Sequence, residues 1–309
     1  MSDAVASGSK IRGTFEVPGT DVAIPFTDVR GARDGPTFLI SGGVHGGEYP
    51  GIAAAIEVAS RLQPEDVSGR VIVLHLTNPP AFWGKSQYWN PLDGKNLNRC
   101  FPGDPRGSAS ERMAARVVQV LDEADYWIDM HGGDIHESLV PFTIFSDAGG
   151  PDVTRTAERM AAAYGIPRLV RSSSVGGSSY AAGAELGKPA ILPESGQVGQ
   201  LDPVSQAIHV QGVLDVLRNF KILPGEPALH PSPQVYTRFI WSRAGQKGFW
   251  RSRVHPGDRV AAGELGGVLT DVYGDVLEEA RVTQSGEVLF AATSFAIGKD
   301  DPLFAVAAP

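Results

Sequence analysis

The chain has 309 residues and a formal net charge of −8, and its hydrophobic content of 42% is ordinary for a globular protein. This length permits one large domain, or a main domain with a small one, and a core that needs no disulfide staples. The acidic balance and the lack of any block of lysine and arginine argue against nucleic acid and anionic membrane surfaces as partners.

Cysteine usage and apolar run length bear on the compartment. Cys100 is the only cysteine, so no intrachain disulfide can form and nothing asks for an oxidising environment. The N-terminal sequence MSDAVASGSKIRG has no charged segment followed by an apolar stretch, and no run approaches the ~18 apolar residues of a membrane span. We therefore expect a cytoplasmic protein with no signal peptide and no membrane segment.

Strand and helix patterns alternate over the first two thirds of the chain. Short apolar runs bounded by glycine, proline or asparagine predict buried strands at 36–44, 70–77, 126–130, 139–145 and 189–193. Helical spacing occurs between them at 50–62, 110–123, 152–164 and 203–218. Ser108 and Glu111 have the spacing of a capping box that opens a helix. This alternation predicts an α/β fold, with a mixed, mostly parallel sheet flanked by helices.

The pattern changes after Asn219. A proline-rich connector occupies about 221–234, and beyond it come short alternating strands with turn signals and no convincing helix. We therefore predict two domains, a catalytic domain at 1–222 and a small C-terminal all-β domain, barrel or sandwich, at 223–309.

The stretch SGGVHGGEYPG, from Ser41 to Gly51, follows the apolar run at 37–40 and carries His45 and Glu48. Ligand sites in open sheets form at the carboxyl ends of strands, and histidine with a carboxylate is a partial ligand set for Zn²⁺. Taken alone, the pair is better explained as polar residues of a glycine-rich turn. A catalytic zinc site requires a third protein ligand.

His131 is the natural candidate for that third ligand. It stands in YWIDMHGG, again directly after a predicted buried strand and before two glycines. Asp129 lies two residues earlier on the same face of the strand, where it could orient the imidazole by a hydrogen bond. His136 competes for the role, but it lies outside the strand, and we interpret it as a solvated or substrate-side residue.

Asn98 and Arg99 form a second constellation, within NPLDGKNLNRCFPGD at 90–104. The asparagine, proline and glycine content predicts a structured loop. A planar guanidinium beside an amide suits two-pronged binding of a substrate carboxylate. The alternative is a loop in which Arg99 makes a structural ion pair.

Glu194 ends the apolar strand PAILP and precedes Ser-Gly, which repeats the placement of the two histidines. A carboxylate there could deprotonate a metal-bound water and carry the proton to a leaving amine. A strand-terminal cap is the alternative.

HGGE, then NLNR, then DMHG, then an apolar strand ending in glutamate occur in that order. Over about residues 36–220 this order resembles the zinc carboxypeptidase superfamily, and within it the succinylglutamate desuccinylase/aspartoacylase family. The small C-terminal β part is also similar to that family, which carries a compact C-terminal β domain. The resemblance implies a zinc carboxypeptidase-like fold that holds one Zn²⁺ per chain through His45, Glu48 and His131.

The same resemblance implies that Asn98 and Arg99 bind the substrate carboxylate and that Glu194 is the general base. One position departs from the family pattern, which has an arginine shortly before the Asn-Arg pair to stabilise the oxyanion. Here Gln87 stands near that place, and Lys85 and Lys95 are alternatives. Because losing one oxyanion donor costs about 2.7–4 kcal/mol, we expect compensation nearby.

The function that these residues predict is a zinc-dependent amidohydrolase that removes an acyl group from a small-molecule N-acyl amino acid or related amine. A metallocarboxypeptidase acting on peptide C-termini is the alternative, because it would use the same zinc set and anchor. A non-catalytic carrier of the biotinyl or lipoyl type is disfavoured, since residues 235–309 contain no Met-Lys pair. The sequence is compatible with a homo-oligomer.

Overall fold

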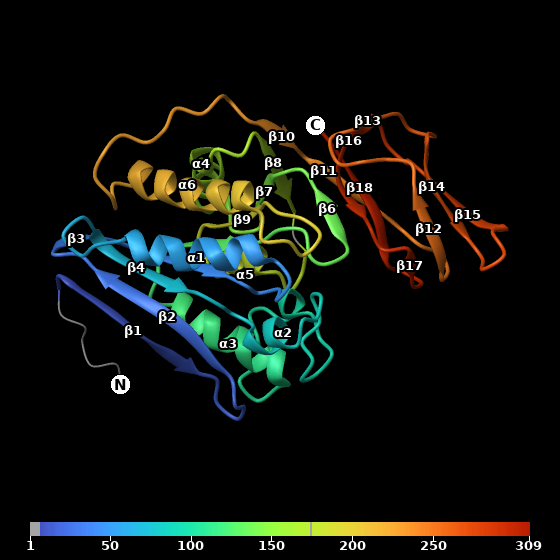
Figure 1. Cartoon of the computed structure of the whole chain (residues 1–309). Coiled ribbons are helices and arrows are strands. Elements are labelled where there is room, and N and C mark those ends of the chain that lie inside the picture. Colours follow the sequence, from blue (N-terminus) through green and yellow to red (C-terminus); the bar gives the residue numbers. More distant parts are fainter. Residues whose placement is uncertain (1–6, 174) are drawn as a thin grey trace.

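The computed structural model describes residues 7–173 and 175–309. The first six residues, part of the segment in which no leader was found, lie outside the described part. Figure 1 shows a large sheet layered between helices and, beside it, a group of antiparallel strands from the C-terminal quarter of the chain. No helix in the two described ranges is long and apolar enough to cross a membrane.

The central sheet is mixed and mostly parallel, as predicted. Strand β3 pairs in parallel with both β4 and β5, and β5 pairs in parallel with β9, whereas the first two strands and β7 join antiparallel. In their order across the sheet, the strands are β1 (Ser9–Glu16), β2 (Ala23–Arg30), β4 (Ser68–Leu74), β3 (Arg33–Gly42), β5 (Tyr126–Met130), β9 (Ala190–Glu194), β7 (Phe142–Ser146), β8 (Arg168–Ser172) and β10 (Gln234–Tyr236).

Helices cover both faces of this sheet. One core cluster joins the buried sides of α1, α4 and α6, and a second joins those of α3 and α5, with the sheet between them. The helices are α1 (Tyr49–Arg61), α2 (Pro79–Trp83), α3 (Ala109–Leu121), α4 (Pro151–Tyr164), α5 (Ser179–Glu185) and α6 (Pro203–Asn219), with a 3-10 turn η1 (Leu97–Arg99). The four predicted helices are confirmed to within one or two residues.

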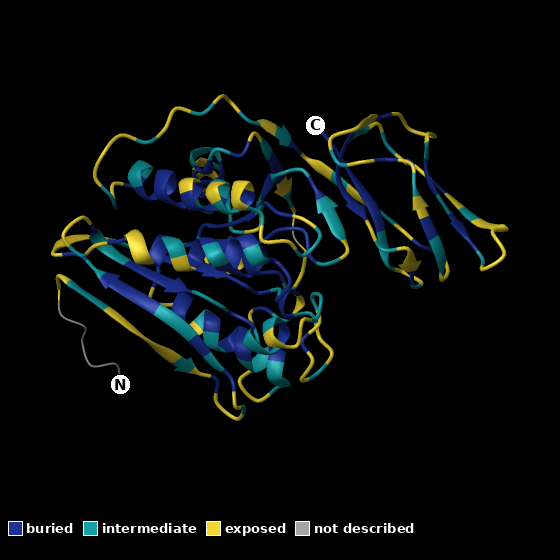
Figure 2. Ribbon diagram, viewed as in Figure 1, coloured by how far each residue is buried: buried dark blue, intermediate teal, exposed yellow. Residues whose placement is uncertain are grey.

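The two-faced core explains the continuous apolar runs. Along β3, Phe38 and Ile40 belong to the cluster on one face, and Leu39 between them belongs to the other. Successive side chains of a strand point to opposite faces, so a strand covered on both sides must be apolar at every position. Figure 2 shows these central strands as buried along most of their length.

The predicted capping box at the start of α3 is present. The backbone N–H of Ser108 donates to Glu111 Oε2 at 2.8 Å, which is the contact that the glutamate contributes to the box. This box satisfies N–H groups that the first helical turn would leave without partners.

The C-terminal part is all β, as predicted, and consists of two antiparallel sheets. The first has the order β11 (Arg238–Arg243), β18 (Pro302–Ala308), β16 (Gly286–Ala292), β13 (Arg259–Val260). The second has the order β15 (Val276–Arg281), β14 (Leu265–Thr270), β12 (Gly248–Ser252), β17 (Ala296–Ile297). A core cluster that includes Trp250, Val288 and Phe304 lies among these strands.

Two strands join the halves of the chain. β10, which follows the proline-rich connector, pairs with β8 of the central sheet, and β6 (Glu137–Leu139) pairs with β16 of the C-terminal sheet. The single strand predicted at 139–145 is therefore wrong: it is divided between β6 and β7 around Pro141, which has no N–H for a ladder. The domain boundary at residue 222 stays a prediction.

Candidate active site

The residues expected to carry the chemistry lie at the ends of three adjacent strands. His45 follows β3 by three residues, His131 follows β5 directly, and Glu194 is the last residue of β9. Since β3, β5 and β9 are parallel neighbours, their carboxyl ends meet at one edge of the sheet. A backbone bridge also pairs His131 with Glu194.

His45, Glu48 and His131 converge on one point. His45 Nδ1 lies 2.6 Å from Glu48 Oε1, and His131 Nδ1 lies 2.9 Å from Glu48 Oε2. The ligand atoms of the three side chains lie within 4.8 Å of one another. Apart from this contact with His131, the buried Glu48 Oε2 has no hydrogen-bond partner among the described residues. Two imidazole nitrogens and a carboxylate at this spacing fit a divalent cation such as zinc, with one position left open.

The outer ring nitrogens of both histidines are already bonded. His45 Nε2 lies 3.0 Å from Asn96 Oδ1, and His131 Nε2 lies 2.9 Å from Asp129 Oδ2. Asp129 is itself held by the Ser41 hydroxyl at 2.6 Å. An Nε2–H that donates to these oxygens leaves the Nδ1 lone pair of each ring directed toward Glu48. Asp129 is thus placed to orient His131, as predicted, and Asn96 is placed to orient His45 in the same way.

Two glycines let this loop pack closely. Gly43 has φ +74°, a left-handed conformation that favours glycine over residues with a side chain. At Gly47, between the first two ligands, an added Cβ would lie 1.9 Å from Asp134 Oδ1. The glycine-rich stretch therefore does more than turn the chain, because it admits a second loop against the metal-binding one.

The charges of the cluster are strongly coupled. Burial by itself would raise the pKa of Glu48, but His45 and His131 outweigh it and hold this pKa at about 2. Burial opposes protonation of His131, yet the carboxylates of Glu48 and Asp129 raise its pKa well above the usual value. The arrangement holds positive charge at its centre, which is what a bound cation would supply.

Glu194 is placed to act on whatever binds there. It is half-buried, its Oε2 has no hydrogen-bond partner among the described residues, and burial and then Glu48 raise its pKa. The following residue is fixed on both sides: the N–H of Ser195 donates to His131 O at 3.0 Å, and Ser195 O lies 3.1 Å from His209 Nε2. Burial lowers the pKa of His209 to about 4, so this histidine is neutral.

Asn98 and Arg99 lie in η1 and differ in what they touch. Asn98 is buried, and its Oδ1 accepts the N–H of Ser179 at the start of α5 at 2.8 Å. Arg99 is exposed; its guanidinium donates to the carbonyl of Asn98 and forms no ion pair with any described carboxylate. The alternative in which Arg99 makes a structural ion pair therefore has no partner in the described part of the chain.

The segment before this turn holds Gln87, which is half-buried and has no hydrogen bond with the described residues. Lys95 forms an ion pair with Glu111 at 3.0 Å, which weakens it as a substitute for the missing arginine. The ring of Tyr88, the next residue along the chain, lies 6.2 Å from that of His45 in an edge-on arrangement.

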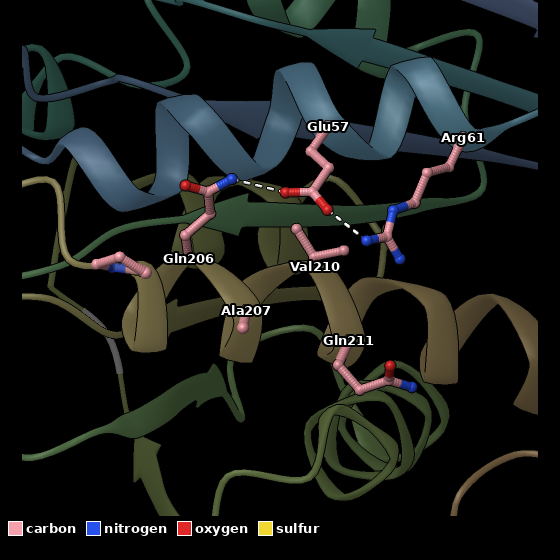
Figure 3. A pocket seen from close by; sticks show the side chains of 7 residues that line it. Glu57, Arg61, Gln206, Ala207, Val210 and Gln211 are labelled. Carbon is pink, nitrogen blue, oxygen red and sulfur yellow. Dashed lines mark hydrogen bonds and ion pairs between the residues drawn. The ribbon is translucent and has the colours of Figure 1, made fainter.

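A surface pocket lies elsewhere, between α1 and α6 (Figure 3). Glu57 of α1 bridges the two helices by accepting from Gln206 at 2.6 Å and pairing with Arg61. None of the residues that line this pocket belongs to the strand-end cluster. It is a groove between packed helices in which Glu57, Arg61 and Gln206 are engaged with one another.

The role of Asp129 leads to a first prediction. Replacing Asp129 by asparagine is expected to weaken zinc binding by about 10- to 100-fold, because the imidazole of His131 loses the carboxylate that fixes its orientation. Competition with a chromophoric chelator measures this affinity, with Asp122→Asn at the exposed end of α3 as the control. Equal zinc affinities of the Asp129→Asn and Asp122→Asn variants would show that Asp129 does not orient His131.

A mixed α/β sheet that brings His, Glu and His donors and a carboxylate to adjacent strand ends defines a metal-dependent hydrolase. The sequence model described as the succinylglutamate desuccinylase/aspartoacylase catalytic domain matches residues 34–220. The chain belongs to this family. It is a deacylase, and His45, Glu48 and His131 form its metal-binding group.

Individual relatives cover most of the chain. The N-alpha-acetyl-L-2,4-diaminobutyric acid deacetylase of Halomonas elongata is 34% identical over 251 residues, which are 79% of this chain and 73% of that protein. The product-bound ectoine utilization protein EutE (DoeB) from Ruegeria pomeroyi matches with a TM-score of 0.89 at 28% identity, over 99% of this chain and 98% of that one. A succinylglutamate desuccinylase/aspartoacylase from Rhodobacter sphaeroides gives 0.86 at 28%, covering 99% and 97%.

Proposed function

We propose that this chain is a zinc-dependent amidohydrolase that removes an acetyl group from a small N-acylated amino acid and holds one Zn²⁺ per chain. The observation that carries the proposal is the meeting of three ligand atoms within 4.8 Å beside Glu194 on the next strand. Two histidines and one carboxylate match the ligand sets of catalytic rather than structural zinc. The name of the similar Halomonas protein supports acetyl as the acyl group and an amino acid as the amine.

The reaction breaks the amide C–N bond and forms a C–O bond from water. Zinc, when bound, supplies a Lewis acid that polarises the carbonyl and acidifies the water. Glu194 accepts the proton of the attacking water at its unpartnered Oε2 and returns it to the leaving nitrogen. The products are a carboxylate and a free amine.

Substrate is held by the loop before α3. Arg99 binds the carboxylate of the amino acid, because it is exposed and has no acidic partner among the described residues. Asn98 offers its NH₂ group beside it, since its oxygen is taken by Ser179. Gln87 supplies a neutral hydrogen-bond donor where the family carries an arginine.

The metallocarboxypeptidase alternative is not supported, because the model that matches residues 34–220 is that of the deacylases. The carrier hypothesis is not supported for the same reason. The proposal is tested by incubating the zinc-loaded protein with a panel of N-acetyl and N-succinyl amino acids and with dipeptides, and by measuring the free amine. We expect release from N-acetyl amino acids. Release of free amine from dipeptides alone would contradict the proposal and would indicate a peptidase.

Arg99 provides a prediction that separates binding from chemistry. Replacing Arg99 by glutamine is expected to raise KM by about 10- to 100-fold, since a charge-assisted hydrogen bond contributes about 1.5–3 kcal/mol. The loss should vanish for a substrate whose carboxylate is converted to an amide. Arg155→Gln, on the exposed face of α4, is the matched control. An equal loss on both substrates would mean that Arg99 only shapes the loop.

Two further proposals concern the chain as a whole. We propose that residues 1–222 and 223–309 are the catalytic and the small β domain, supported by the separate core cluster of the C-terminal strands. We also propose a cytoplasmic location, supported by the single cysteine, Cys100.

A further inference from the structure

A buried histidine and a buried tyrosine lie behind the strand end that carries Glu194. His209 lies inside α6, and Tyr164 is the last residue of α4. An added Cβ at Gly212 would lie 2.5 Å from the ring of Tyr164, so the glycine admits this ring against α6. Tyr164 and Val210 belong to the apolar cluster of α1, α4 and α6. Because a buried polar group costs free energy unless it is hydrogen-bonded, the bonds of this pair decide what it does.

Hydrogen bonds on both sides fix the ring of His209. Its Nε2 lies 3.1 Å from the carbonyl oxygen of Ser195, and since a carbonyl can only accept, Nε2 carries the proton. Its Nδ1 lies 2.8 Å from the hydroxyl of Tyr164, which donates to the remaining lone pair. Burial lowers the pKa of His209 to about 4, in agreement with a neutral ring that donates once and accepts once.

The carbonyl that His209 holds belongs to the residue directly after the proposed base. The ladder between β9 and β7 ends at Glu194, so the next residue needs other partners. The N–H of Ser195 donates to His131 O at 3.0 Å, and its Oγ is buried without a hydrogen-bond partner among the described residues. The peptide group before Ser195 is therefore held by the backbone of His131, and the peptide group after it by the side chain of His209.

The position of this backbone matters because little else directs the base. Glu194 Oε2 has no hydrogen-bond partner in the described part of the chain, so its direction depends on the backbone that carries it. The Ser195 carbonyl is also tightly packed, since an added Cβ at Gly132 would lie 2.4 Å from its oxygen. A shift of this carbonyl would therefore move Glu194 relative to the segment that follows His131.

We propose that His209 is a positioning residue: supported by Tyr164, it holds the Ser195 carbonyl and thereby keeps the carboxylate of Glu194 directed at the attacking water. This inference rests on the proposed function, in which Glu194 is the base. His209 takes no proton from the reaction, because its Nε2–H and its Nδ1 lone pair are both engaged. A displacement of about 1 Å in a catalytic group can cost on the order of 100-fold in rate.

A role confined to packing α4 on α6 is the alternative. The two roles differ in what they predict for a folded, zinc-loaded variant. Loss of packing lowers Tm and leaves the turnover of the folded molecules unchanged, whereas loss of positioning lowers kcat and leaves KM and zinc content nearly unchanged. A residue that restores the hydrogen bond without the ring should restore kcat only if His209 positions the base.

The first test compares His209→Leu with His209→Gln in zinc-loaded protein, with an N-acetyl amino acid as substrate. Leucine has no donor, whereas the amide of glutamine offers an N–H to the Ser195 carbonyl. We expect kcat to fall by about 10- to 100-fold in the leucine variant, with KM within a few-fold and one zinc per chain. The glutamine variant should stay within about 5-fold of wild-type kcat, because its donor replaces Nε2–H.

Tyr164→Phe tests the second hydrogen bond with the loss of one oxygen atom. Without the hydroxyl, the proton of His209 can move to Nδ1, which leaves the Ser195 carbonyl without a donor. We expect kcat to fall by about 3- to 10-fold, the size of one neutral hydrogen bond. The double variant Tyr164→Phe/His209→Leu should be no slower than His209→Leu alone, because Tyr164 acts only through His209.

A readout that does not depend on catalysis is ¹⁵N NMR of zinc-loaded protein labelled at histidine. The signal of His209 is the one that His209→Gln removes. We expect this ring to be neutral with its proton on Nε2 at about pH 7, and Tyr164→Phe to populate the Nδ1–H form. A wild-type ring that is protonated on Nδ1 would overturn the proposal.

The matched control is Val213→Ala, one turn further along α6, where a buried side chain of the same cluster loses packing without losing a hydrogen bond. It should lower Tm and keep wild-type kcat. Equal kcat losses in Val213→Ala and His209→Leu would overturn the proposal, and so would equal losses in the leucine and glutamine variants. If His209→Leu does not fold, an unchanged kcat in Tyr164→Phe would overturn it. Failure of the wild-type protein to hydrolyse any N-acyl amino acid would instead count against the proposed function.

Discussion

Replacing His45 by alanine is expected to remove stoichiometric zinc binding and to lower kcat/KM by at least about 1,000-fold. The reason is that the metal stabilises the transition state by several kcal/mol. His45 provides one of three converging donors, and a two-donor site cannot hold the ion tightly. Metal analysis of the purified variant, together with release of free amine from an N-acetyl amino acid, measures both effects.

His45 is the better choice than His131 for this experiment. The side chain of His131 is 1% exposed and contacts both Glu48 and Asp129, so its removal takes one partner away from each of two buried carboxylates. His45 is 12% exposed, and its loss disturbs the fold less. His255→Ala, 81% exposed in the C-terminal part, serves as the histidine control. A His45 variant that keeps its metal and its activity would show that the strand-end cluster takes no part in the mechanism.

The second large effect is expected for Glu194→Gln. The amide keeps the shape of the carboxylate but cannot accept the proton of water, so kcat should fall by about 100- to 10,000-fold while KM changes little. Zinc content should stay at one per chain, because Glu194 lies beside the ligand group without belonging to it. Steady-state kinetics and metal analysis on the same preparation separate these quantities.

The stability of this variant gives an internal check. Burial and Glu48 raise the pKa of Glu194 in the metal-free protein, so its ionised form destabilises the fold at pH values above the ordinary carboxyl pKa. A neutral glutamine removes that cost, and the Tm of the metal-free variant at pH 7 should not be lower than that of wild type. Glu185→Gln at the exposed end of α5 is the control. An unchanged kcat in the Glu194 variant would assign the base to another residue.

The strands that position the chemistry were predictable from sequence because the core covers them on both faces. The runs at 126–130 and 189–193 are β5 and β9 almost without change. Glycine and proline bound these runs sharply, so the histidine or glutamate at each end was recognisable as a strand-end residue. The order of the motifs then brought the candidates together without knowledge of their distances.

The elements that were missed have weaker patterns. β1 is an edge strand whose residues are mostly exposed, and in SKIRGTFE the apolar Ile11 and Phe15 alternate with charged residues, so the segment has no continuous apolar run. β8 is five residues long and carries an arginine at each side of its apolar pair. α5 has only seven residues, too few to display the periodicity of a helix. Each of these elements exists because of its neighbours in the fold.

The supporting residues of the site show the same limit. Asn96 lies within NLNR, so the motif pointed to it, yet its contact with His45 spans 51 positions. His209 reaches the carbonyl of Ser195 from the interior of α6, where a histidine has no distinctive sequence pattern. The position of Glu137 depends on the pairing of β6 with β16, which no local pattern indicates. Long-range pairing creates these contacts, so they become visible only in the folded chain.

The central claim is that His45, Glu48, His131 and Glu194 form a zinc-dependent deacylase site. The most direct measurement loads the metal-free protein with one equivalent of zinc and follows acetate and free amine from an N-acetyl amino acid. The account predicts no release before zinc is added and equal amounts of both products afterwards. A protein that holds one zinc per chain and releases neither product from any N-acyl amino acid would contradict it.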